Sequence, residues 1–497
     1  MSSEDSGDDR LDPRLLALIG VVLLGGLLGI LNSTMAAVAT EELAGSLDAS
    51  LSTVGWASTG FLLAVTATIP FTTWAVDRFG ARRLWLVGLA IFLTGSLTAG
   101  LAWDVGSLIA FRTLQGFGAG LLDPLVLILL ARAAGPHRAG RVMGLMGVVL
   151  SLGPVLGPVA GGAVLSGLSW RWMFLLSAPL GLLALVLAVR VLPSDAPASD
   201  GTSPGGTSPG GRLDVVGLAL LGPGFAAVVL ALSQTAERST VTAWQALLPL
   251  ALGAALLAGY GVHAARALRA AHDARRTPPL VDPRLFANRG FSASVTIMGL
   301  GGVANFAAFF ALPFYYQQAH GHGVLAAGLL MSPVGLGGAV AMPLAGRLSD
   351  RVGARGLAIG GALLAAACAL VFTRFDAGTH ELWPVLAALA LGLGMGCYSS
   401  PTMGSLYRAL PAALVAQGSS VLYMLNQLGA ALGIACVTLV MQTAPDAITG
   451  FHRVFWLVTA VLVLVLCTVP LLPGRPRASA VAAAGAARGA VSSGQSR

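Results

Sequence analysis

The sequence predicts an all-α integral membrane protein with fourteen transmembrane helices. Of its 497 residues, 56% are hydrophobic and only 10% are charged, and the mean hydropathy is +0.81. A soluble protein of this length carries about a quarter charged residues. The apolar residues also gather into fourteen runs, each near the length that a helix needs to cross about 30 Å of hydrocarbon. These observations together indicate a polytopic membrane protein.

The predicted spans follow one another along almost the whole chain. They cover Leu15–Ala37, Val54–Val76, Leu84–Trp103, Leu108–Ala131, Val142–Leu165, Trp172–Leu192, Val215–Leu232, Trp244–Ala264, Phe291–Tyr316, Val324–Ala345, Leu357–Phe372, Leu382–Leu406, Ser419–Met441 and Phe455–Leu472.

Arginine supplies all the basic residues and predicts the orientation of the spans. Inner loops of membrane proteins are enriched in basic residues. When the N-terminus is placed inside the cell, the arginines that fall in outer loops are Arg171, Arg238, Arg374 and Arg453. We therefore expect both termini in the cytoplasm and the chain in a bacterial inner membrane. The basic pI, near 10, then reflects topology and not nucleic-acid binding.

An internal repeat predicts two related halves. Asp77-Arg78-Phe79-Gly80-Ala81-Arg82 recurs as Asp350-Arg351-Val352-Gly353-Ala354-Arg355, after the second and the tenth span. Many secondary transporters are built from repeated halves. Two six-helix halves would place the second copy after the eighth span, so we expect two extra helices between them. The predicted order is a disordered cytoplasmic tail (1–14), an N-terminal six-helix bundle (15–192), a flexible cytoplasmic linker (193–212), two extra transmembrane helices (213–265), a basic cytoplasmic loop (266–290), a C-terminal six-helix bundle (291–473) and a disordered cytoplasmic tail (474–497).

Each copy of the repeat predicts an ion-pair latch on the cytoplasmic face. An Asp at a helix end, with arginines across a tight Gly turn, favours ion pairing there. Such a latch favours one of two bundle arrangements. The alternative is a topology anchor with a turn. The latch residues are Asp77, Arg78, Gly80 and Arg82, and Asp350, Arg351, Gly353 and Arg355.

The stretch Gly147–Gly162 predicts a bent helix with a smooth face. Glycines recur there every four residues, which lets another helix backbone approach closely. Two prolines remove backbone donors and favour kinks. We expect this helix to act as a pivot or seal between the bundles; plain packing of small residues is the alternative. The residues are Gly153, Pro154, Gly157, Pro158, Gly161 and Gly162.

Arg112 and Asp123 are charged residues within the fourth span. Charges in hydrocarbon are costly and usually mark function. Eleven residues of helix place the two on one face, about 16 Å apart. Burial disfavours the charged form of a carboxyl group, so Asp123 could load and release a proton. The alternatives are snorkelling of Arg112 to the interface and a carboxylate that is hydrogen-bonded at the Pro124 kink.

These motifs resemble those of the major facilitator superfamily, in particular its fourteen-helix drug:proton antiporters. Gly153 to Gly162 matches the antiporter signature of the fifth helix, and Asp77 to Arg83 resembles the signature loop between the second and third helices. Arg112, Gln115, Gly116 and Gly118 match the motif of the fourth helix. The resemblance covers about 15–472. It implies two pseudo-symmetric six-helix bundles with two extra central helices, and proton-coupled drug export.

The first span departs from the family pattern, which carries an Asp where this chain has Asn32. Because Asn cannot titrate, we expect Asp123 to carry the coupled proton, assisted by Arg112. The outer pair Glu41 and Glu42 is the alternative. Polar and aromatic residues within apolar runs are candidates for substrate binding, with hydrogen bonds between helices as the alternative. They are Asn32, Trp56, Gln115, Asn305, Tyr315, Tyr398, Tyr423, Asn426 and Gln427.

We therefore expect a proton-coupled exporter of hydrophobic or amphiphilic drugs or antibiotics, with protons, a lipophilic substrate and membrane lipid as its partners. A dedicated exporter of a self-produced antibiotic or metabolite is the first alternative, and a transport-inactive sensor or scaffold is the second. No catalytic set points to an enzyme, no cluster to a metal or cofactor, and no basic patch to nucleic acid. We expect a monomer.

Overall fold

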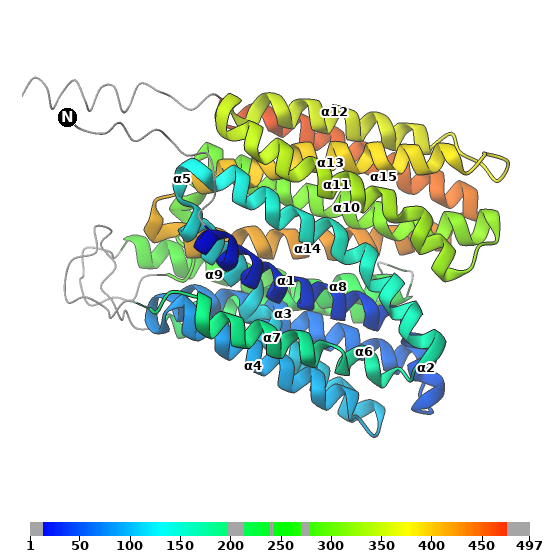
Figure 1. Ribbon diagram of the computed structural model, residues 1–497, viewed down its shortest axis with the longest axis horizontal. Helices are drawn as coiled ribbons and strands as arrows, with labels where there is room; N and C mark the ends of the chain where they lie inside the picture. The colour runs from blue at the N-terminus through cyan, green and yellow to red at the C-terminus, as the bar shows by residue number, and fades with distance from the viewer. Residues whose placement is uncertain (1–12, 196–212, 239, 241, 270–278, 475–497) are drawn as a thin grey trace, which may run out of the picture.

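The computed structural model describes residues 13–195, 213–238, 240, 242–269 and 279–474, and these form a helical bundle without strands (Figure 1). Its α-helices are α1 (Pro13–Val38), α2 (Thr40–Ser46), α3 (Leu51–Phe79), α4 (Ala81–Gly100), α5 (Val105–Gly167), α6 (Arg171–Leu175), α7 (Ser177–Val191), α8 (Val215–Arg238), α9 (Trp244–Arg269), α10 (Arg289–His320), α11 (Val324–Val352), α12 (Ala354–Phe372), α13 (Leu382–Ala409), α14 (Val415–Thr443) and α15 (Ala447–Thr468). Short 3-10 helices are η1 (Pro283–Ala287), η2 (Ala412–Leu414) and η3 (Val469–Leu471).

The described residues contain 14 helical segments that are long and apolar enough to cross a membrane, which confirms the predicted number of spans. Helix α5 holds two of them, Val105–Ala134 and Arg138–Gly167. The backbone is helical at 132–141, where the sequence suggested a loop between spans. Helices α6 and α7 together form the sixth span. Of the predicted tails, residues 1–12 and 475–497 lie outside the described residues, as do 196–212 of the predicted linker and 270–278 of the predicted basic loop.

Two bundles lie side by side (Figure 1). The N-terminal half comprises α1 to α7, and its core contains the fully buried Trp85 and Phe92. The C-terminal half comprises α10 to η3, and Phe372 stacks on Phe455 in its core, with ring centroids 4.5 Å apart. Burial of such large aromatic side chains stabilises each half as a unit.

Both copies of the repeat end a helix in the same way. Gly80 follows α3 with φ of 89°, and Gly353 follows α11 with φ of 90°. Residues with a side chain rarely adopt this conformation, so glycine permits the turn into the next helix. After each turn an arginine contacts the last helix of its own half, or the residue that directly follows it. Arg82 donates to the Val189 carbonyl oxygen at 2.6 Å, and Arg355 donates to that of Leu472 at 2.7 and 2.9 Å.

We call the end of the bundle that carries these turns the arginine-rich end; α2 and α6 lie at the opposite end (Figure 1). The two halves meet there through close backbone contact. A Cβ atom on Gly144 of α5 would lie 2.6 Å from the Met342 carbonyl oxygen of α11, so only glycine allows this approach.

The two extra helices lie against both halves. Helix α8 contacts α3 of one half and α14 of the other, and α9 packs on α8. At the arginine-rich end, the Tyr260 hydroxyl of α9 donates to the Val281 carbonyl oxygen at 2.9 Å and accepts from the Val281 amide at 2.8 Å. The backbone amide of the next residue, Asp282, donates a hydrogen bond to Gln417 Oε1 of α14 at 3.0 Å. The pair α8–α9 is therefore tied to the C-terminal half by its loop as well as by packing.

Candidate functional site

A cavity of about 360 Å³ lies between the two halves. Its walls come from α1, α3 and α5 on one side, from α10, α11, α13 and α14 on the other, and from α8. Most of the lining side chains are apolar or aromatic, including Phe61, Phe306, Phe309, Phe310 and Met395. Among the described residues that line it, Arg112 and Asp123 are the charged ones. Such a cavity suits a lipophilic molecule with few polar groups.

Asp123 lies where the halves meet. Its carboxyl group, on α5, lies close enough to the hydroxyl of Tyr423 on α14 to interact with it, and both side chains line the cavity. The carboxyl group therefore contacts the cavity and the opposite half at once, instead of pointing toward lipid. A negative charge on this carboxyl group would therefore act directly at the contact between the halves.

Arg112 lies in the N-terminal half with neutral partners. Its Nη1 donates to Asn32 Oδ1 and to Gln115 Oε1, both at 2.7 Å. The guanidinium carbon lies 4.3 Å from the centroid of the Phe61 ring and 5.6 Å from that of Phe174. Its buried Nε has no hydrogen-bond partner. The charge is thus held by amide oxygens and aromatic faces, and the side chain does not snorkel to an interface.

The predicted substrate-binding residues divide into three groups. Asn305, Tyr398, Tyr423, Asn426 and Gln427 line the cavity. Asn32 and Gln115 are buried behind it and hold Arg112, and Asn32 also donates to Ser177 Oγ at 3.0 Å. The other two, Trp56 and Tyr315, lie away from the cavity, and Trp56 is exposed.

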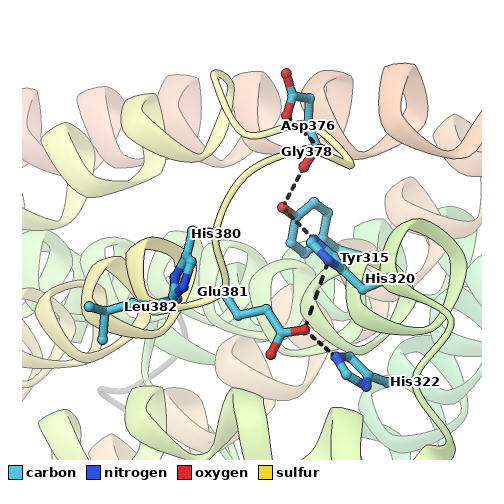
Figure 2. A network of polar contacts seen from close by, with 8 residues as sticks. All are labelled: Tyr315, His320, His322, Asp376, Gly378, His380, Glu381 and Leu382. Carbon is cyan, nitrogen blue, oxygen red and sulfur yellow. Dashed lines mark hydrogen bonds and ion pairs between the residues drawn. The ribbon is translucent and has the colours of Figure 1, made fainter.

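Tyr315 belongs to a polar network at the opposite end of the bundle, shown in Figure 2. Its hydroxyl donates to the Asp376 carbonyl oxygen at 2.9 Å and contacts His320 Nε2 at 3.1 Å. Glu381 completes the network, because its Oε1 lies 2.6 Å from His322 Nε2 and 4.0 Å from His320 Nδ1. The network fastens the loop before α13 to the ends of α10 and α11. Its sequence signal was weak, because His320 and His322 fall just beyond the predicted span Phe291–Tyr316.

The glycine-rich segment of α5 lies between α1 and α11. A Cβ atom on Gly153 would overlap Ile30, and one on Gly157 would overlap Thr34, so this glycine face packs on α1 of the same half. The other face meets α11, where a Cβ atom on Gly335 would lie 2.8 Å from the Ser151 carbonyl oxygen. Contact between halves therefore uses the face opposite the motif glycines. Of the remaining motif residues, Pro154 lines the cavity, and the side chain of Pro158 lies outside the described residues. A Cβ atom on Gly161 would lie 3.1 Å from Met173, whereas one on Gly162 would meet open space.

The second copy of the repeat joins the two halves. Asp350 Oδ1 lies 2.6 Å from Arg408 Nη1 of α13. The Asp350 carboxylate also accepts from the amides of Gly140 and Arg141 on α5, at 3.1 and 2.9 Å. Gly346 permits this approach, since a Cβ atom there would overlap the Gly140 carbonyl oxygen. Arg408 was not among the predicted latch residues, because a single arginine at the end of a span is indistinguishable from a topology signal.

The first copy of the repeat makes a different contact. Asp77 Oδ1 lies 3.6 Å from Arg132 Nη2 in the same half, and both side chains are exposed. The link to the other half comes from Thr73, whose hydroxyl donates to Ser420 Oγ of α14 at 2.8 Å. Thr73 occupies the position that Gly346 holds in the second copy, so its side chain replaces the close backbone approach with one hydrogen bond.

Comparison with known proteins identifies the family. Residues 22–434 match the family model described as Major Facilitator Superfamily. The chain belongs to the Major Facilitator Superfamily. It is 36% identical over 443 residues to the Multidrug resistance protein B homolog of Mycobacterium tuberculosis, covering 88% of this chain and 78% of that protein. It is 30% identical to the Puromycin resistance protein pur8 of Streptomyces alboniger, covering 89% and 84% of the two chains.

Solved structures of this superfamily share the fold at low sequence identity. The human transporter MFSD10 superposes with a TM-score of 0.61 at 17% identity, covering 91% of this chain and 100% of that one. The proton:xylose symporter XylE superposes with a TM-score of 0.62 at 16% identity, covering 91% and 94%. The superfamily fold therefore extends over nearly all of this chain, and the resemblance read from its motifs is confirmed.

Proposed function

We propose that this protein is a proton-coupled exporter of hydrophobic or amphiphilic drugs or antibiotics that works by alternating access. Relatives with names that denote multidrug and antibiotic resistance support the substrate class. The apolar cavity between the halves supplies a chamber for such molecules. The observation that carries the proposal is the position of Asp123, which lines this chamber and lies beside Tyr423 of the other half.

The proposed cycle follows from these contacts. The arginine-rich end faces the cytoplasm, and in this structure the bonds of Asp350 and Thr73 hold that end together. A proton from outside binds Asp123 and weakens its hydrogen bond with Tyr423, which lowers the cost of separating the halves. Substrate binding from the inside and release of the proton favour the reverse change.

The test is export by everted membrane vesicles under an imposed proton gradient, with N-phenyl-1-naphthylamine as a fluorescent probe. We expect the wild type to move the probe and a protonophore to stop it. Asp123→Asn should lose proton-driven movement by at least about tenfold, because the amide cannot exchange a proton.

The matched control is the double change of Glu41 and Glu42 to Gln at the predicted outer mouth, which should retain proton-driven movement. Full proton-driven export by Asp123→Asn would refute the role of Asp123. Loss of coupling in the glutamate variant alone would assign the proton to that pair.

A further inference from the structure

Arg112 places a positive charge in the wall of an otherwise nearly uncharged chamber. Only 1% of the side chain is exposed, and it lines the cavity together with Phe61. Its bound acceptors, Asn32 Oδ1 and Gln115 Oε1, are neutral amide oxygens. Hydrogen bonds to neutral acceptors orient a guanidinium but leave its charge uncompensated.

The described residues provide this charge with no ionic partner. None of the ion pairs found among them includes Arg112. Asp123, the acid of the cavity wall, lies eleven residues further along the same helix, about 16 Å away, beside Tyr423. A buried charge without a counter-charge is costly, and in folded proteins such groups are normally paired.

Arg112 also has a hydrogen-bond donor that is not used. The Nε of Arg112 is buried without a hydrogen-bond partner. A guanidinium presents its donors as a planar fork that matches the paired oxygens of a carboxylate or sulfonate. The ring of Phe61 packs over the guanidinium, 4.3 Å from its central carbon, and both residues line the cavity, so an anion reaches the fork when this ring turns aside.

We propose that Arg112 receives the single acidic group of a lipophilic substrate, so that the chamber binds monoanionic compounds in preference to neutral ones of the same skeleton. The inference rests on the proposed function in that it names part of the substrate class. One unpaired guanidinium compensates one negative charge, and the apolar walls accept the remainder of the molecule. Asn32 acts as a positioning residue, because its neutral amide holds the fork without neutralising it.

The experiment uses two probes that differ by one acidic group, 8-anilinonaphthalene-1-sulfonate and N-phenyl-1-naphthylamine. Purified full-length protein in zwitterionic nanodiscs is titrated with each probe, and binding is followed by energy transfer from tryptophan, with empty nanodiscs subtracted. Arg112→Gln should weaken binding of the sulfonate by about tenfold and change binding of the neutral amine less than about twofold.

The isosteric variant Asn32→Asp keeps Arg112 and sets a counter-charge at the position of the present 2.7 Å contact. It should weaken sulfonate binding by a similar factor, whereas Arg112→Lys, which keeps the charge but loses the planar fork, should weaken it less than Arg112→Gln. These two variants decide the question if Arg112→Gln does not fold. The proposal would be overturned if wild type and Asn32→Asp bound the sulfonate with equal affinity. It would also be overturned if Arg112→Gln lost the same factor of affinity for the sulfonate and for the neutral amine.

Failure of the proposed function is separable from failure of this inference. If the protein binds both probes with the expected dependence on residues 32 and 112 but vesicles export neither, the export proposal fails and the anion site stands. If vesicles export the neutral amine but these substitutions leave the affinity for the sulfonate unchanged, the anion site is refuted and the proposed export function stands.

Discussion

The hydroxyl of Tyr423 lies beside the carboxyl group of Asp123 across the interface between the two halves, where it can donate a hydrogen bond to it. The two residues come from helices α5 and α14, and both face the central cavity. A hydroxyl donor stabilises the ionised carboxylate more than the protonated acid. The same bond therefore affects two properties, the proton affinity of the carboxyl group and the attraction between the halves.

Removal of this donor should shift the pH dependence of export. In Tyr423→Phe the carboxylate loses a hydrogen bond worth about 1.5–3 kcal/mol when it is charged, so it retains its proton to higher pH. We expect the pH of half-maximal export to rise by about one unit, with the maximal rate within a few-fold of the wild type. The measurement is probe export by everted vesicles across a series of pH values.

Tyr398→Phe is the matched control, because Tyr398 also lines the cavity, whereas the tyrosine that interacts with Asp123 is Tyr423. Its pH profile should coincide with that of the wild type. An unchanged profile in Tyr423→Phe, or the same displacement in both variants, would contradict the proposed coupling.

The two repeat acids should differ strongly in their effect on the closed arginine-rich end. Asp350→Asn leaves Arg408 and two amides of α5 without their carboxylate, which we expect to shift the equilibrium toward opening by about 2 kcal/mol, or about thirtyfold. Asp77→Asn removes an exposed pair with a 3.6 Å separation, which contributes about 0–1 kcal/mol.

A cysteine at Ser420 can report this opening. Ser420 is fully buried against Thr73, so in a background without the four native cysteines a maleimide reaches Ser420→Cys only when that end opens. Labelling should accelerate at least about tenfold with Asp350→Asn and less than about threefold with Asp77→Asn. Equal acceleration by both changes would show that the two copies are equivalent after all.

The number of spans could be predicted because hydrophobic length and the absence of charge are properties of each segment alone. The placement of Arg112, Asp123 and Tyr423 at the cavity could also be predicted from single segments, since a polar group within an apolar run must find a partner or a cavity. The difference between the two latches could not be predicted from the sequence, because it depends on whether Thr73 or Gly346 lies where two helices cross. Tyr315 was misleading for a related reason: near the end of a span, an aromatic residue with a polar tip can serve a loop network as well as a cavity.

Packing against α1 predicts which glycine of the signature segment is indispensable. A Cβ atom on Gly157 would overlap Thr34, whereas one on Gly162 would meet nothing within 4 Å. Gly157→Ala should therefore destabilise the N-terminal half by about 1–3 kcal/mol and reduce export, while Gly162→Ala should behave as the wild type. The measurements are the unfolding temperature in detergent and the level of drug resistance that each variant confers. Equal sensitivity at the two positions would show that the motif acts otherwise than through this contact.

Helix α8 should influence substrate size through one side chain. Val229 is the described residue by which this helix lines the cavity, although the helix lies outside both six-helix halves. Val229→Trp extends an indole into a chamber of about 360 Å³, so it should exclude bulky compounds and spare small ones. In an efflux-deficient host, resistance to the largest members of a series of lipophilic antibiotics should fall about tenfold, and resistance to the smallest less than twofold.

Val216→Trp, on the exposed surface of the same helix, controls for a general effect of tryptophan and should leave the whole series unchanged. A uniform loss in Val229→Trp across all sizes would mean that α8 acts on stability and does not shape the chamber.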